Sequence, residues 1–208
     1  MKHYKVSMNK FNSERHILDD VHHAVTFLFQ NSGAEKGTEP EFRVKIVGET
    51  EKQVLFSLYT ETQLSSTRVQ NVVIEVEEDP SWEPVVPEEG KAVRLFGVVA
   101  YSQHLTTPRN FGSRSGTTKH VVWKDRRGNT CVDSDILVPY LEKRTGLCDV
   151  ELVTVKKIDT LNLSKMRVAN AFKVEIQGKV RDKSATEKLN VSSVGKKRSY
   201  GFGGLFFV

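Results

Sequence analysis

Cysteine is scarce in this 208-residue chain, and its spacing excludes the usual structural zinc sites. The two cysteines, Cys131 and Cys148, are too few and too far apart for a zinc ribbon, and the chain holds no Cys-x-x-Cys pair. No His/Cys/Asp cluster has the spacing of metal ligands either. We therefore expect two reduced thiols in a cytosolic protein, with no metal and no small-molecule cofactor.

Long hydrophobic runs are also missing. No segment approaches the roughly 20 apolar residues of a membrane span, and the N-terminus, MKHYKVSMNK, lacks an apolar stretch of signal-peptide length. The chain has no Gly-x-Ser-x-Gly elbow, and in GSRSGTTK (residues 112–119) no lysine follows the second glycine as a phosphate loop requires. A soluble protein with no membrane partner, in the cytoplasm, is the expectation.

Positive charge is plentiful. The formal net charge is +5, and the hydrophobic fraction of 38% suffices for an ordinary core. Such a balance favours a polyanionic partner such as nucleic acid, although many basic proteins bind none.

Two similar successions of elements follow one another along the chain. Hydrophobic periodicity and turn residues predict strand, helix, strand, strand, an unassigned segment and strand in the first part, and strand, helix, strand, strand, helix and strand in the second. The first-part elements are expected at 2–8, 17–29, 42–47, 53–59 and 69–76. The second-part elements are expected at 92–101, 120–124 (a short extra strand), 134–144, 150–157, 171–180, 184–190 and 199–208.

Each half of the chain therefore has the order of elements of the ferredoxin-like fold. We predict an α+β protein of two tandem ferredoxin-like (RRM-like) domains, with antiparallel sheets and helices on one face. The proline-rich acidic stretch EEDPSWEPVVPEEG marks the boundary. The expected division is a first domain at 1–78, a linker at 79–90 and a second domain at 91–208. The topology alone does not specify a function.

The last fifteen residues, VGKKRSYGFGGLFFV, combine glycines, cations and an apolar run. Glycine lets a backbone approach phosphates closely, and successive N–H groups can form an anion-binding nest. A phosphate-holding loop is one interpretation, and a glycine-rich turn with solvated charges is the other. The residues assigned to this loop are Gly195, Lys196, Lys197, Arg198, Tyr200, Gly201 and Gly203.

Two histidines lie beside the apolar face of the first predicted helix. A histidine can take the proton of a ribose 2′-hydroxyl near neutral pH, the step that starts metal-independent RNA cleavage. His22 is the first candidate and His23 the second. Asp19 precedes His22 by three residues, so its carboxylate could orient the imidazole. An ordinary surface histidine is the alternative.

Several pieces of the chain occur together and in order. They are YKV (4–6), VHHAVTFLFQ (21–30), EEDPSWEP (77–84), PYLEKRTGL (139–147), FKVEIQGKVRD (172–182) and VGKKRSYGFGGLFF (194–207). In the presence and order of these segments, the chain resembles the CasE family of the RAMP superfamily, the Cascade-associated endoribonucleases that process CRISPR RNA. The similarity spans nearly the whole chain.

The resemblance implies a function in the cytoplasm of a prokaryote. It implies cleavage of a precursor at the base of a CRISPR repeat stem-loop, without metal, by attack of a ribose 2′-hydroxyl on the adjacent phosphate. It also implies that the protein stays on its product as a subunit of a Cascade-type complex, next to the backbone subunit near the 3′ end of the guide. The family's histidine falls on His22.

Some family positions differ here. The family's tyrosine falls on Asp19, a lysine of some members falls on Phe27, and the Asn-Pro-x-Lys segment reads YSQHLTT. A catalytically silent RNA-binding subunit is therefore the first alternative, and a ferredoxin-like scaffold that contacts only protein is the second. Further cations outside the terminal loop are candidates for RNA backbone contacts. They are Arg109, Arg114, Lys119, Lys156, Lys157, Lys165 and Arg167.

Overall fold

The computed structural model describes residues 1–11, 16–33, 40–100, 103–104, 118–119, 121–159, 161–163, 166–168, 171–194 and 201–208. The first half contains β1 (Lys2–Asn9), α1 (Ile17–Asn31), β2 (Phe42–Glu49), β3 (Gln53–Thr60), β4 (Thr67–Val69) and β5 (Val72–Glu78). The second half contains β6 (Ala92–Ala100), β7 (Gln103–His104), β8 (Thr118–Lys119), β9 (Val122–Lys124), β10 (Thr130–Val132), α2 (Ser134–Thr145), β11 (Leu147–Lys157), β12 (Leu161–Leu163), β13 (Met166–Val168), β14 (Ala171–Val180), α3 (Lys183–Lys188) and β15 (Leu205–Phe207).

The first sheet is antiparallel, with strand order β2-β3-β1-β5-β4. Alternation along β1 sends Tyr4, Val6 and Met8 into the core, because successive strand residues face opposite sides. One helix, α1, covers that face with a stripe of apolar residues that recurs every three or four positions. The fully buried members of the stripe are Val21, Ala24, Val25 and Leu28.

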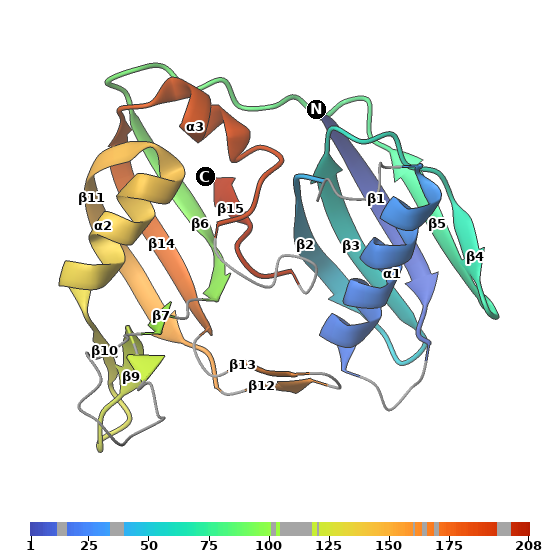
Figure 1. The fold of residues 1–208 in the computed structure, drawn as a ribbon, viewed down its shortest axis with the longest axis horizontal. Helices are drawn as coiled ribbons and strands as arrows, with labels where there is room; N and C mark the ends of the chain where they lie inside the picture. The colour runs from blue at the N-terminus through green and yellow to red at the C-terminus, as the bar shows by residue number, and fades with distance from the viewer. Residues whose placement is uncertain are drawn as a thin grey trace, which may run out of the picture.

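The second sheet is antiparallel as well, with strand order β11-β14-β6-β15. Its core includes Leu95, Val174 and Ile176 from the strands and Leu137 and Leu141 from α2. Two small hairpins, β9–β10 and β12–β13, extend from this half (Figure 1). The two halves lie side by side, with β15 and β2 at the junction (Figure 1).

Both sheets place their main strands in the same order, which is that of the ferredoxin-like fold. Numbering the four main strands of each half along the chain gives the spatial order second, third, first, fourth in both. The predicted fold class is therefore confirmed. The first half departs in two respects: it has an additional edge strand, β4, and residues 61–66, where the second helix of the motif would lie, form neither helix nor strand. Only Leu64 of this stretch is buried.

Two predicted strands are wrong in their bounds. The stretch 69–76 is not one strand, because the chain turns at Gln70 (φ 54°) and the β4–β5 hairpin results. The predicted final strand at 199–208 is too long. Residues 201–203 form a turn in which Gly201 and Gly203 have positive φ, so the strand among the described residues 201–208 is Leu205–Phe207. The other main elements lie within about three residues of their predicted positions, as expected for element ends.

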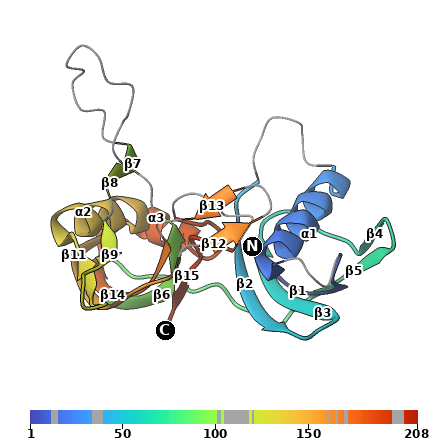
Figure 2. The ribbon, with the colours of Figure 1, turned by 90° about the horizontal axis from the view of Figure 1, so that it is seen from below.

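The helices of the described residues, α1, α2 and α3, lie on the same side of the two sheets (Figure 2). The opposite side therefore exposes strands from both halves. Within the described part of the chain, no helix has the length and apolar character needed to cross a membrane.

Candidate functional site

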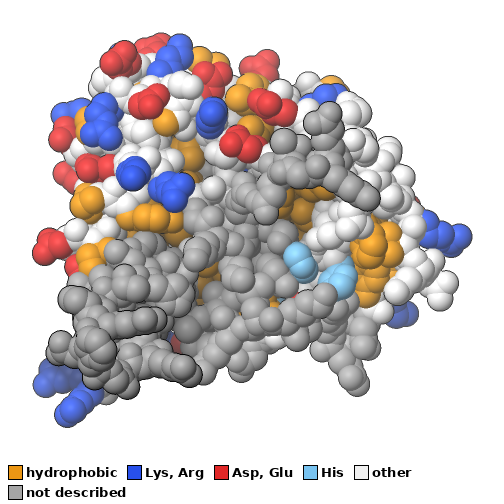
Figure 3. All heavy atoms as spheres, in the orientation of Figure 1, with side chains coloured by type: hydrophobic (Ala, Val, Ile, Leu, Met, Phe, Trp, Pro, Cys, Tyr) orange, Lys and Arg blue, Asp and Glu red, His pale blue; other side chains and the backbone are white. Residues whose placement is uncertain are grey.

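Helix α1 carries both candidate histidines at the middle of its length. His16 caps the helix, since its Nδ1 accepts a hydrogen bond from the Leu18 N–H at 3.2 Å. His22 and His23 are half-buried, and their ring centroids lie 5.8 Å apart. Histidine side chains are visible on the helix-bearing side of the first half in the space-filling view (Figure 3).

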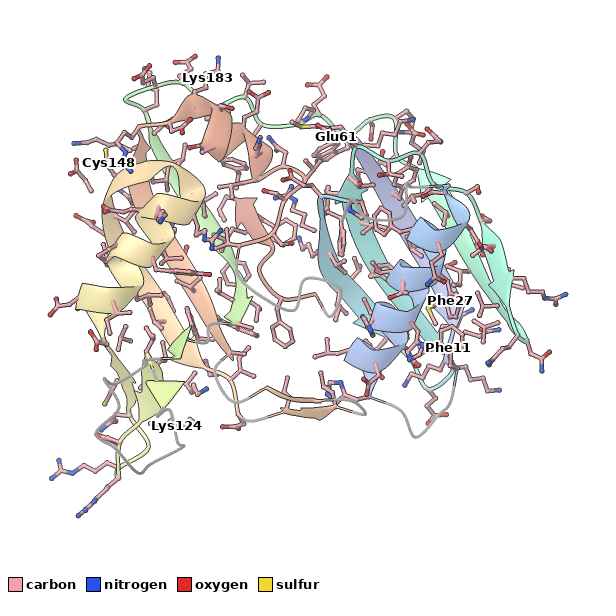
Figure 4. All side chains as sticks on the ribbon, viewed as in Figure 1. Phe11, Phe27, Glu61, Lys124, Cys148 and Lys183 are labelled. Carbon is pink, nitrogen blue, oxygen red and sulfur yellow. The ribbon has the colours of Figure 1, made fainter. Side chains whose placement is uncertain are left out.

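The surroundings of His23 are aromatic. Its ring centroid lies 5.9 Å from that of Phe11 and 6.4 Å from that of Phe27 (both phenylalanines are labelled in Figure 4). Phe27 is also the position where some family members carry a lysine. These contacts favour a packing role for His23 and leave His22 as the better candidate for chemistry.

Two carboxylates are buried in the first turn of α1. Asp19 is 2% exposed and Asp20 is 0% exposed. The backbone dipole favours negative charge at this end of a helix. From the sequence, only Asp19 was a site candidate. Two consecutive aspartates in a first helical turn are usually exposed to solvent, so the sequence did not indicate that both would be buried here.

The glycine turn at the C-terminus (residues 201–203) is hydrogen-bonded to strand β6 and to Val194, the last described residue of the preceding loop. The Gly203 N–H donates to Val98 O at 2.5 Å, and Val194 N–H donates to Gly203 O at 2.7 Å. A Cβ atom on Gly203 would lie 2.2 Å from Val194 O, whereas one on Gly201 would lie 3.8 Å from its nearest neighbour, Ile46. Glycine is therefore required at Gly203 because a side chain would clash with the backbone of Val194. At Gly201 it is favoured only because φ is 81°.

A small apolar cluster joins the two sequence features. It consists of Phe202 from the glycine turn with Ala100, Leu163 and Ala171, and Leu18 of α1 packs against it. Leu18 lies one helical turn before His22. The histidine-bearing helix and the glycine turn, which are about 180 residues apart in the sequence, thus converge at the junction of the two halves.

Arg43 connects the first sheet to the last strand. Its Nη1 donates to Leu205 O at 2.7 Å, and its guanidinium carbon lies 4.4 Å from the ring centroids of both Tyr59 and Phe206. The residue is 3% exposed, and burial lowers the pKa of Arg43 to about 10. Ser193 adds a second link, since its Oγ donates to Phe42 O at 2.8 Å. No local pattern in the sequence distinguishes Arg43 from a surface cation.

The predicted RNA-binding cations are only partly within the described residues. Lys156 and Lys157 end strand β11, and burial lowers the pKa of Lys157. Lys119 and Arg167 lie in β8 and β13, but the described part of the chain does not include their side chains. The remaining candidates lie outside the described residues. They are Arg109, Arg114, Lys165, Gly195, Lys196, Lys197, Arg198 and Tyr200.

The described residues contain no group of three or more His, Cys, Asp or Glu side chains placed to hold a metal ion. One pocket of about 380 Å³ lies on the side of the first sheet away from α1, where Lys5, Ser57 and Glu75 line it. It does not include either histidine of the helix.

The comparisons with known proteins define the class of fold. No protein-family model and no curated protein matches the sequence. Solved structures do match, and those with the same fold are CRISPR-associated proteins. Cas6e from Escherichia coli K-12 is similar with a TM-score of 0.60 at 16% identity, over 100% of this chain and 99% of that chain.

Two further structures show the same fold. The CRISPR endoribonuclease Cse3 bound to a 19-nucleotide RNA gives a TM-score of 0.54 at 15% identity, with 100% of both chains covered. A chain of a CRISPR RNA-guided surveillance complex gives 0.55 at 14% identity, over 99% of this chain and 98% of that chain. These similarities confirm, at the level of the fold, the resemblance to the CasE family.

Proposed function

We propose that this protein is a metal-independent endoribonuclease that binds the stem-loop of a CRISPR repeat RNA and cleaves at its base. The observation that carries the proposal is the convergence of the His22 helix and the glycine turn around Phe202. RNA cleavage of this kind needs a general base close to a site that holds the RNA phosphates, and a glycine backbone can approach phosphates closely. The end-to-end similarity to RNA-bound Cse3 supports the same substrate class.

The proposed reaction is an internal transesterification. His22 accepts the proton of a ribose 2′-hydroxyl, and the 2′-oxygen attacks the adjacent phosphorus. The bond from phosphorus to the 5′-oxygen of the next nucleotide breaks, and that oxygen takes up a proton. The products are a 2′,3′-cyclic phosphate, which can open to a 3′-phosphate, and a 5′-hydroxyl. Asp19 would orient the base, with His23 as the alternative base.

The partners follow from the same proposal. The mature guide RNA would remain bound, and the protein would form a subunit of a Cascade-type complex, next to the backbone subunit near the guide 3′ end. The similarity to a chain of a surveillance complex supports this. Residues 1–78 and 91–208 would form the two domains, because the first sheet ends at Glu78 and the second begins at Ala92.

The alternative function is a catalytically silent RNA-binding subunit of the same complex. It is favoured by Asp19 and Phe27, which stand where family members carry a tyrosine and a lysine. The two functions share the RNA contacts and differ only in whether the protein cleaves the RNA, a step that would depend on His22.

The test is cleavage of labelled CRISPR repeat hairpins in EDTA, with wild type, His22→Ala and His23→Ala. We expect cleavage without metal, and a rate for His22→Ala at least about 10²-fold lower at nearly unchanged affinity, since a general base supplies 10²–10⁴-fold. His23→Ala is the matched control and should be milder. A substrate with a 2′-deoxy sugar at the cleavage site should bind without being cut.

Three results would change the conclusion. Cleavage that stops in EDTA and returns with magnesium would overturn the mechanism. Salt-sensitive binding without cleavage of any repeat would establish the silent subunit. A damaging His23→Ala beside a mild His22→Ala would reverse the assignment within the pair.

A further inference from the structure

The β9–β10 hairpin presents two arginines at a protruding tip. Its turn closes through hydrogen bonds from Gly128 N–H to Asp125 O at 3.0 Å and from Asp125 N–H to Asn129 O at 2.9 Å. Between them stand Arg126 and Arg127, both exposed. The hairpin extends from the lower edge of the second half, where Lys124 is labelled (Figure 4).

The carboxylate of Asp125 accepts hydrogen bonds from within the turn and so stabilises it. Asp125 Oδ1 accepts from the N–H groups of Arg127 and Asn129, each at 2.8 Å, and Oδ2 accepts from Asn129 Nδ2 at 3.0 Å. These hydrogen bonds, that of the Asn129 side chain first, lower the pKa of Asp125. Arg126 and Arg127 form no ion pair with any side chain in the described part of the chain. The turn therefore presents two exposed guanidinium groups that have no acidic partner among the described residues.

The base of the hairpin belongs to a larger basic edge. Lys124 Nζ lies 2.9 Å from Asp159 Oδ1, an exposed ion pair between the hairpin and the residues that follow β11. Lys124 is the main cause, and Lys156 and Lys157 are lesser causes, of a lowered pKa of Asp159. Since Lys156 and Lys157 are themselves candidate RNA contacts, the tip continues a cationic edge that starts at β11.

We propose that Arg126 and Arg127 form a second RNA contact, which binds phosphates of the repeat stem away from the cleavage site. The inference rests on the proposed function. Guanidinium groups bind phosphate oxygens in a bidentate manner, and duplex RNA is recognised mainly through its backbone and shape. The hairpin belongs to the second half and α1 to the first, on the left and right of Figure 1, so an RNA that contacts both must span the two halves, as a base-paired stem can.

The experiment compares wild type with the double variant Arg126→Ala/Arg127→Ala in salt-dependent binding of a repeat hairpin. We expect binding about tenfold weaker and a salt slope lower by up to about two, because each lost phosphate contact releases about one counterion fewer. The cleavage rate at saturating RNA should not change. The double variant Lys183→Ala/Lys188→Ala is the control: it removes the same charge from α3, at the top of the molecule (Figure 4), and should retain the wild-type slope.

A second RNA locates the contact. On a hairpin shortened at the loop end of its stem, wild type and the arginine variant should bind equally, because the phosphates that the tip would reach are gone. If the variant binds the full hairpin with wild-type affinity and slope, the inference is overturned, and an acidic protein surface becomes the occupant to test. If wild type binds no repeat RNA, the proposed function itself fails.

Discussion

At the residue scale, Asp79 shows how one side chain joins the linker to the first sheet. Its Oδ2 lies 3.1 Å from Lys5 Nζ and 3.4 Å from His3 Nδ1, and its Oδ1 accepts from the Ser81 hydroxyl at 2.6 Å. The Ser81 hydrogen bond, followed by Lys5, lowers the pKa of Asp79 to about 2. Burial lowers the pKa of His3, against the opposing effect of Asp79.

We predict that Asp79→Asn lowers stability at pH 7. The folded-state pKa of Asp79 lies below its ordinary value of 3.8, so the carboxylate stabilises the fold above about pH 4 and loses this effect as the pH falls towards 2. The difference between wild type and variant should therefore persist from pH 7 to 4 and close below it. Urea unfolding across this range measures it, and Glu83→Gln, an exposed neighbour, is the control. A stability difference between wild type and Asp79→Asn that does not vary with pH would contradict the lowered pKa of Asp79.

At the element scale, the glycine turn before β15 combines two different demands on glycine. Both Gly201 and Gly203 have a φ above +80°, a region that L-residues with a Cβ adopt at a cost of about 1–2 kcal/mol. Only Gly203 is also enclosed by backbone, since its Cβ would clash with Val194. A similar close approach occurs at Gly97, where a Cβ would lie 2.0 Å from Gly204 O.

We predict that Gly203→Ala costs at least twice as much unfolding free energy as Gly201→Ala, for which we expect about 1–2 kcal/mol. Chemical denaturation of both variants provides the measurement. Because Gly201→Ala retains the packing of the turn, it also tests the phosphate loop: weaker RNA binding in a folded Gly201→Ala protein would support close approach of RNA at this backbone. Equal stability losses for the two variants would contradict the geometry.

At the scale of the whole molecule, Arg43 holds the two halves in a defined arrangement. Its hydrogen bond to Leu205 links residues 162 positions apart, and its two ring contacts come one from each half. No acidic partner offsets its burial in the described residues, and Nε makes no hydrogen bond. The cation is therefore costly to bury, and orientation of the halves is its clearest contribution.

We predict that Arg43→Ala lowers stability by about 2–4 kcal/mol, because it leaves a cavity at the junction and frees the Leu205 carbonyl. Arg43→Met fills most of the volume without a charge, and should cost less than about 1.5 kcal/mol. Both variants should cleave RNA more slowly if the arrangement of the halves positions His22. Lys45→Met is the control, because Lys45 is exposed on the same strand, 5.4 Å from the Phe206 ring. Wild-type cleavage by both Arg43 variants would show that this contact serves stability alone.

The sequence was informative wherever a property is local. Alternation and helical periodicity predicted the strands of both sheets and the apolar stripe of α1, because these patterns arise from which side each residue faces. The segment 69–76 was misread, since Val69 and the β-branched residues from Val72 onwards suggest one strand, whereas Gln70, which has a positive φ, and Asn71 form a turn between two strands. The glycines of the C-terminal stretch were recognised, but not that residues 201–203 form a turn that shortens the final strand.

The sequence by itself determined the order of elements, the two ferredoxin-like halves and the candidate base His22. Tertiary structure decided which residues meet: Leu18 with the Phe202 cluster, Arg43 with Leu205, and Lys124 with Asp159. The reason is physical. A residue's periodicity is set by its neighbours in the chain, whereas its burial and partners depend on how two separately specified sheets pack, and the sequence carries no local signal for a contact between residues 43 and 205.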